Sequence, residues 1–317
     1  MTPSNCTDQK ETFFPQIASI PVEVAPTEIY DDLHWQALNN WTSGNFRMIP
    51  FFPPLMQENG TKDPNGIAQL MASNFQSVSV AQKAFGYLNG STSAKPIFGP
   101  NLTNALDFTD RELGTLVSRM KASGIYETTL LIVGAKHGQS PIDPTLSRKI
   151  PPAVLQNATT VKFAHVTADD GAYIWLTDAS PENIAKAKAD LLAASAKTGV
   201  ASILAGSEVY QNGFGDPRID PRVPDLIVVV KIGVVYTAVD SPKNMEHGGI
   251  NPDDLTVALF LHNPSFKATT ISERVYTRQV AVTILEALGA PVTQLDGAQI
   301  DGTVVLPGLS FSSSKSE

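Results

Sequence analysis

Two histidine–glycine pairs are the residues of this sequence best suited to carry chemistry. In the first, His137 follows Lys136 within the string TLLIVGAKHGQSPIDP, residues 129–144. In the second, two glycines follow His247 within MEHGGINPDDLTVALFLHN, residues 245–263. Imidazoles are common ligands of divalent metals, and a lysine ammonium binds phosphate-like anions as a point charge. These residues could therefore form a metal or anion site, or they could be an ordinary solvated strand end.

The elements around these pairs would place them at a sheet edge. TLLIVG, residues 129–134, is a continuous run of Leu and β-branched residues, which is typical of a strand buried on both faces of a parallel sheet. Open α/β folds bind ligands at the carboxyl ends of such strands, where Lys136 and His137 would lie. If His247 reaches the same edge, the two imidazoles can share one metal, although spacing alone does not establish this.

Helix and strand patterns alternate after residue 100, which predicts an α/β/α sandwich with a mainly parallel sheet. Helices are expected over residues 30–39, 104–123, 181–196 and 275–288. Strands are expected over residues 129–134, 161–166, 172–176, 226–230, 233–236 and 255–261. The Asp169–Asp170 pair could contact a metal but is expected to be a solvated turn, and the Asp253–Asp254 pair is expected to cap a helix or a turn.

The chain is predicted to divide near residue 100. Pro, Gly, Asn and Ser interrupt every pattern before that point, so residues 1–100 are expected to be an irregular remnant of an N-terminal half. Residues 101–310 would form the α/β domain and residues 311–317 a disordered tail. An unpaired apolar edge at residues 74–80 or 129–134 would favour self-association or a partner.

Composition excludes several classes of function. The 317 residues carry a formal net charge of −8 without a cluster of Lys or Arg, which argues against nucleic acid and acidic membranes as partners. The apolar runs are too short to cross a bilayer.

The single cysteine, Cys6, excludes an intramolecular disulfide, and the first ten residues lack a secretory signal. Six glycosylation-type triplets nevertheless suggest a secretory lineage, so the localisation stays open; they begin at Asn5, Asn40, Asn59, Asn89, Asn101 and Asn157.

Several strings in a fixed order resemble the alkaline phosphatase superfamily, in particular its type I phosphodiesterase/nucleotide pyrophosphatase branch. They are NFQSVSVAQK (74–83), AKHGQSPID (135–143), Glu-His-Gly-Gly (246–249), QVAVTILEALGA (279–290) and VLPGL (305–309). The resemblance covers residues 30–309, and this part of the chain is similar to the C-terminal portion of such enzymes. It implies an alkaline-phosphatase-like fold, apparently without its N-terminal part, and hydrolysis of phosphoric esters.

The resemblance also implies one or two divalent metals, zinc or a similar ion, with His137 and His247 as ligands. The family usually has Asp-His-Gly where this chain has Lys136 before His137, so Lys136 would hold the substrate phosphate in place of a metal ligand. No segment before Tyr30 resembles the family's Ser or Thr nucleophile, and the catalytic residue is therefore unknown. A phosphodiesterase-like protein with impaired or no activity is expected; a non-catalytic or relic chain that keeps the fold is the alternative.

Overall fold

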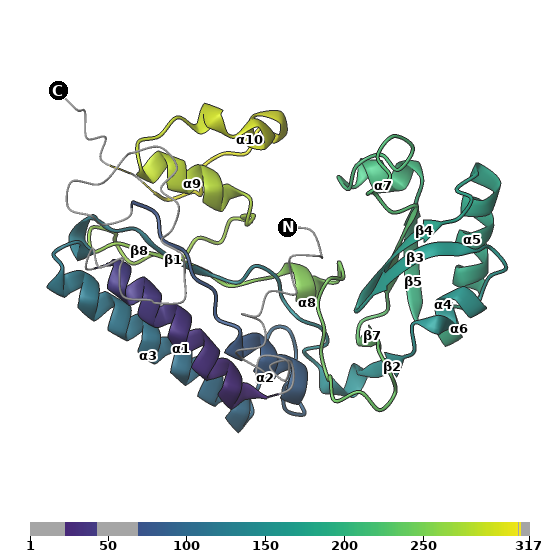
Figure 1. Ribbon diagram of the computed structural model, residues 1–317, viewed down its shortest axis with the longest axis horizontal. Helices are drawn as coiled ribbons and strands as arrows, with labels where there is room; N and C mark the ends of the chain where they lie inside the picture. The colour runs from purple at the N-terminus through teal and green to yellow at the C-terminus, as the bar shows by residue number, and fades with distance from the viewer. Residues whose placement is uncertain (1–22, 43–68, 310, 312–317) are drawn as a thin grey trace, which may run out of the picture. The chain divides into compact units, whose positions relative to one another are not determined.

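The computed structural model describes residues 23–42, 69–309 and 311, and its mixture of helices and sheets confirms the α/β class (Figure 1). The helices are α1 Val24–Trp41, α2 Ser77–Phe85, α3 Pro100–Ala122, α4 Ala153–Asn157, α5 Pro181–Ala193, α6 Ser195–Thr198, α7 Ser207–Gln211, α8 Pro252–Leu255, α9 Gln279–Ala287 and α10 Asp296–Asp301. Short 3₁₀ helices are η4 Tyr126–Thr128, η5 Pro144–Leu146 and η6 Val292–Gln294. None of the helices in these residues is long and apolar enough to cross a membrane.

The strands form three small sheets. They are β1 Leu131–Gly134, β2 Arg148–Ile150, β3 Phe163–Ala168, β4 Gly171–Leu176, β5 Val200–Ala205, β6 Leu226–Val230, β7 Val234–Tyr236 and β8 Leu259–His262. A four-stranded antiparallel sheet has the order β3-β4-β6-β5, while β1 pairs antiparallel with β8 and β2 pairs parallel with β7. The parallel part of the described structure is therefore much smaller than expected.

The short connection between β3 and β4 explains part of this difference. Only Asp169 and Asp170 join the two strands, and a link of two residues can connect antiparallel strands but not parallel ones. The expected parallel strand at 129–134 is β1, which pairs antiparallel with β8. Its residues 131–133 are half-buried rather than fully buried, so this strand is not enclosed on both faces.

The described chain forms two compact units. Unit 1 comprises residues 23–34, 74–112 and 137–257, and unit 2 comprises residues 35–42, 69–73, 113–136, 258–309 and 311. Both histidines of interest, His137 and His247, belong to unit 1. Expectations for residues 1–22, 43–68, 310 and 312–317 lie outside the described residues.

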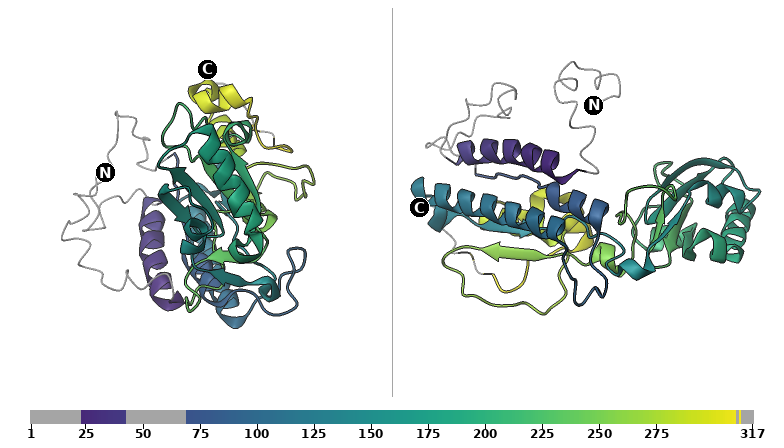
Figure 2. Two further views of the ribbon diagram at one scale, coloured as in Figure 1. Left: turned by 90° about the vertical axis from the view of Figure 1, so that its right-hand side faces the viewer. Right: turned by 90° about the horizontal axis from the view of Figure 1, so that it is seen from below.

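The main core of unit 1 lies between the four-stranded sheet and helices α4 and α5 (Figures 1 and 2). Alternate residues of β4 and β6 face these helices because strand side chains point to opposite faces in turn. The buried residues of this core include Ile174, Leu226, Val228, Leu155 and Leu191. Val209 of α7 packs with Ile227 in a separate cluster. The sheet is thus packed on both faces and gives a fixed frame for the turns at its edge.

The segment at residues 74–80, expected to be an apolar strand edge, instead leads into helix α2. Its buried residues Ser77, Val80 and Ala81 are spaced as one face of a helix. The carboxylate of Asp31 accepts hydrogen bonds from the backbone N–H groups of Gln76 and Ser77 at 2.8–2.9 Å. It therefore satisfies donors that the first turn of a helix leaves without partners.

Unit 2 is built on the β1–β8 pair and helix α9. The C-terminal VLPGL string is anchored to α9, because Thr283 Oγ1 accepts a hydrogen bond from the backbone N–H of Leu306 at 3.0 Å. Gln279 also donates to the carbonyl of Val304 at 3.2 Å. Thr283 and Leu306 are both buried.

Candidate metal and phosphate site

The structure brings the two histidines of the sequence analysis together. The rings of His137 and His247 are stacked, with centroids 3.8 Å apart and planes inclined by 4°. The Nδ1 atom of His137 lies 2.8 Å from the carbonyl oxygen of Gly138, and the Nδ1 atom of His247 lies 3.1 Å from Oε2 of Glu246. An acceptor lies within hydrogen-bond distance of Nδ1 in the His137 ring, and a carboxylate oxygen lies near Nδ1 in the His247 ring without forming a hydrogen bond to it.

Backbone contacts hold the two histidine segments beside each other. Ser140 and Glu246 form an antiparallel bridge, with N–H to O distances of 2.8 and 3.0 Å. The N–H of Gly138 also donates to the carbonyl of Asp254 at 2.7 Å. A Cβ atom on Gly138 would lie 1.9 Å from the carbonyl oxygen of Asp253, so only glycine fits at this position.

Glu246 is the electrostatic centre of this region, and its side chain is only 3% exposed. Its Oε2 atom lies 2.8 Å from Nζ of Lys83, and its Oε1 atom accepts a hydrogen bond from Lys243. Burial raises the pKa of Glu246, but hydrogen bonds from His247, Lys243 and Lys83 outweigh it and hold that pKa well below its usual range. Glu246 is therefore an anion beside the His247 ring, and it accepts a hydrogen bond from the backbone N–H of His247 at 3.2 Å.

The donor set suits a divalent metal but is incomplete. The Nε2 atoms of His137 and His247 are appropriate ligands for zinc. Catalytic zinc sites normally have three protein ligands, and no group of three His, Cys, Asp or Glu side chains able to hold a metal occurs in the part of the chain that the structure describes. Parallel rings also direct their in-plane lone pairs side by side, so one imidazole must tilt before both can bind a single ion.

Lys136, predicted to bind phosphate, has an exposed side chain. It forms no ion pair with another described residue, so its ammonium is available to an anion. The Asp169–Asp170 pair differs from the prediction of a solvated turn, since Asp170 is 1% exposed. Asp253 and Asp254, expected to cap a helix or turn, lie in the first turn of α8 with Asn251 at the N-cap, and they are 7% and 4% exposed.

These aspartates are buried because other parts of unit 1 cover them. Asp253 accepts hydrogen bonds from Ser93 Oγ at 2.5 Å and from the N–H of Ile142 at 3.0 Å. Burial is the main cause that raises the pKa of Asp169, and the neighbouring Glu246 raises it further. Sequence reasoning missed Glu246 and its two lysine partners as well, since their contacts are long-range and leave no local pattern.

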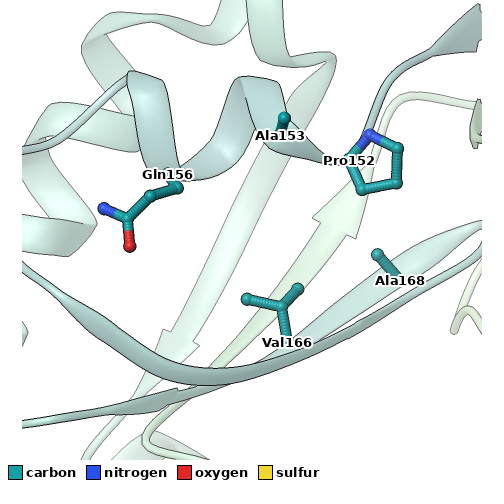
Figure 3. A pocket seen from close by; sticks show the side chains of 5 residues that line it. All are labelled: Pro152, Ala153, Gln156, Val166 and Ala168. Carbon is teal, nitrogen blue, oxygen red and sulfur yellow. The ribbon is translucent and has the colours of Figure 1, made fainter.

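A separate pocket of about 310 Å³ lies between α4 and the sheet (Figure 3). It is lined by Pro152, Ala153, Gln156, Val166 and Ala168. Gln156 provides the polar side-chain atoms of this lining. The Gln156 amide donates to the carbonyl of Val161 and accepts from the N–H of Phe163, both at 2.9 Å. The pocket therefore offers no unused polar side-chain group that would orient a phosphoric ester.

An α/β protein with these histidine–glycine strings is of the alkaline phosphatase superfamily type. A model of the type I phosphodiesterase/nucleotide pyrophosphatase family matches residues 12–252, and the chain belongs to that family. This confirms the resemblance drawn from the sequence strings. A comparison with proteins of curated function finds no match.

Similar solved structures belong to the same superfamily. Human ectonucleotide pyrophosphatase/phosphodiesterase 5 is 17% identical, with 72% of this chain and 53% of that chain covered and a TM-score of 0.44. The murine protein of the same name is 15% identical, with 61% and 50% covered and a TM-score of 0.47. Wild-type alkaline phosphatase PafA is 15% identical, with 69% and 44% covered and a TM-score of 0.45. This chain spans about half the length of these proteins.

Proposed function

We propose that this chain binds a divalent metal of the zinc type through Nε2 of His137 and of His247, and a phosphoric ester beside it. The stacked imidazole pair carries the proposal, because it brings two potential metal ligands from distant segments of the chain into contact. Membership of the phosphodiesterase family supports a phosphoric ester as the ligand. When bound, the metal would polarise a phosphoryl oxygen.

Lys136 is proposed to hold the phosphate. Its exposed ammonium supplies a positive charge at the position where the family usually has a metal-binding carboxylate, and a lysine attracts a phosphate oxygen without fixing its orientation. With two imidazoles and no third metal-binding side chain in the described residues, the chain alone is proposed to hydrolyse phosphodiesters and phosphomonoesters at or near background.

Isothermal titration of the full chain with zinc tests the metal site. The unmodified chain should bind zinc, and His137→Ala and His247→Ala should each weaken zinc binding at least about tenfold. Removing a residue that only supports a ligand lowers metal affinity about 10–100-fold, and removing the ligand itself should lower the affinity no less. His165→Ala is the matched control, because His165 is exposed on β3 and should leave the affinity unchanged. Equal zinc affinity in all four proteins would contradict the site.

Hydrolysis of bis(p-nitrophenyl) phosphate and p-nitrophenyl phosphate, with and without zinc, manganese or calcium, tests the activity. We expect rates close to the uncatalysed reaction. Metal-stimulated turnover that is absent from both His137→Ala and His247→Ala would overturn the expectation of background activity and would show that an active nucleophile is present. Weaker retention on a phosphate-ester resin by Lys136→Met than by the unmodified chain would support the role of Lys136.

A further inference from the structure

Two buried carboxyl groups of unit 1 have no hydrogen-bond donor. Asp170 lies in the turn between β3 and β4, and Asp254 lies in α8; they are 1% and 4% exposed. None of their four carboxylate oxygens has a hydrogen-bond partner among the described residues, and neither group forms an ion pair there. A buried ionised carboxylate is very unfavourable unless it is paired or coordinates a metal. The pair therefore requires either a shared proton or a bound cation.

The oxygens of both groups converge beside Gly249. A Cβ atom on this glycine would lie 2.5 Å from the carbonyl oxygen of Asp170, 3.1 Å from Oδ1 of Asp170 and 2.9 Å from Oδ2 of Asp254. Three oxygens from two distant segments thus lie close together beside the α-carbon of Gly249, where a larger side chain would not fit. Such an oxygen-only arrangement is typical of a site for a hard cation.

The neighbouring carboxyl groups add negative charge around this pair. Burial, followed by the close approach of Asp170 and the charges of Asp170 and Asp253, raises the pKa of Asp254 to about 9, although the backbone of Asn251 opposes the shift. The hydroxyl of Tyr173 donates to the carbonyl of Gly248 at 2.8 Å, so this proton is already used. Burial is also the main cause that raises the pKa of Tyr173, followed by the charges of Asp170 and Asp254. A cation would relieve the repulsion within this group.

We propose that Asp170 and Asp254 bind a divalent cation of the calcium type. Calcium accepts carboxylate and carbonyl oxygens in flexible geometry at about 2.3–2.6 Å, whereas magnesium demands a near-ideal octahedron at about 2.0–2.1 Å, which an irregular group of oxygens is less able to supply. The absence of imidazole at these oxygens distinguishes the site from the zinc-type site proposed for His137 and His247. A cation here would join the β3–β4 turn to α8.

Calorimetric titration of the chelator-treated full chain with calcium chloride tests this proposal. We expect calcium to bind and to raise the Tm by several degrees, because binding to the folded state alone stabilises it. Asp170→Asn and Asp254→Asn should each weaken calcium binding at least about tenfold, whereas Asp240→Asn, which alters an exposed aspartate, should not. Circular dichroism would verify that each variant is folded.

His247→Ala separates this proposal from the zinc-type site, because it should keep its calcium response while losing zinc. Absence of calcium binding by the unmodified chain, together with a higher Tm for Asp254→Asn, would overturn the proposal and indicate a shared proton instead. Unchanged calcium affinity in both Asn variants would also overturn it. Stronger binding of magnesium than of calcium would contradict the proposed class of cation.

Discussion

Replacement of Glu246 by Gln tests whether this buried carboxylate stabilises the region that holds His247. Glutamine keeps the shape of the side chain but removes the charge that pairs with Lys83 and Lys243. Removing one partner of a buried ion pair costs about 3–5 kcal/mol. Because Lys83 is 16% exposed and Lys243 is 34% exposed, water can solvate the remaining ammonium groups in part. We therefore expect Glu246→Gln to lower the free energy of unfolding by about 3 kcal/mol.

The effect should depend on pH with a defined sign. The pKa of Glu246 is held below its usual range in the folded state, although burial opposes this, because His247, Lys243 and Lys83 donate to its carboxylate. The stabilisation is thus fully present above the unfolded-state pKa of about 4.3 and is lost as the pH falls towards the folded-state pKa. The difference between the two proteins should be largest near neutral pH and should narrow below about pH 4.

Urea denaturation at pH 7 and at pH 3–5 measures these differences. Glu208→Gln is the matched control, because Glu208 pairs with Lys188 at 2.6 Å but its side chain is 44% exposed. An exposed pair contributes about 0–1 kcal/mol, so this control should change stability little. If both variants lose the same small amount, or if the Glu246→Gln difference does not change with pH, the reasoning about buried charge is wrong.

Three further substitutions test backbone and capping features by thermal and urea unfolding. Gly138→Ala should lower the free energy of unfolding by about 3 kcal/mol or more, because the new methyl group would lie 1.9 Å from the backbone oxygen of Asp253. A decrease below about 1 kcal/mol would show that the backbone can move. Gly114→Ala should stabilise it by about 0.5–1 kcal/mol, since the site is an exposed helix interior with nothing within 4 Å of the added Cβ; any destabilisation would contradict this. Asp31→Ala should cost about 1–2 kcal/mol, because it removes the acceptor for the N–H groups that begin α2, and an unchanged midpoint would refute that capping role.

Local sequence patterns predicted many elements but not how the strands pair. The strand expected at Leu226–Val230 has the same bounds as β6, and the helix expected from Pro181 begins at that residue as α5. The helix over 104–123 is α3, which begins slightly earlier. Burial determines the composition of a strand, whereas the connection determines its direction. The short interval between the strands expected at 161–166 and 172–176 already favoured a hairpin over a parallel pair.

The candidate site was predictable only where glycine and histidine form a recognisable string. His137 and His247 could be selected because each precedes a glycine near an expected strand, and the structure places their rings in contact. Their role as metal ligands remains a prediction. Asp170 was expected in a solvated turn and Asp254 in a cap, and only the tertiary structure shows that both are buried.

The backbone bridge between Ser140 and Glu246 joins positions more than 100 residues apart, and the whole four-stranded sheet is inserted between them. Doubling the length of a flexible loop costs only about 0.6 kcal/mol of closure entropy. Variation in the surface loops of the inserted sheet can therefore be large without separating the two histidine segments. Changes in the length of those loops should therefore leave the histidine pair in place, provided that this bridge and the close approach at Gly138 are kept.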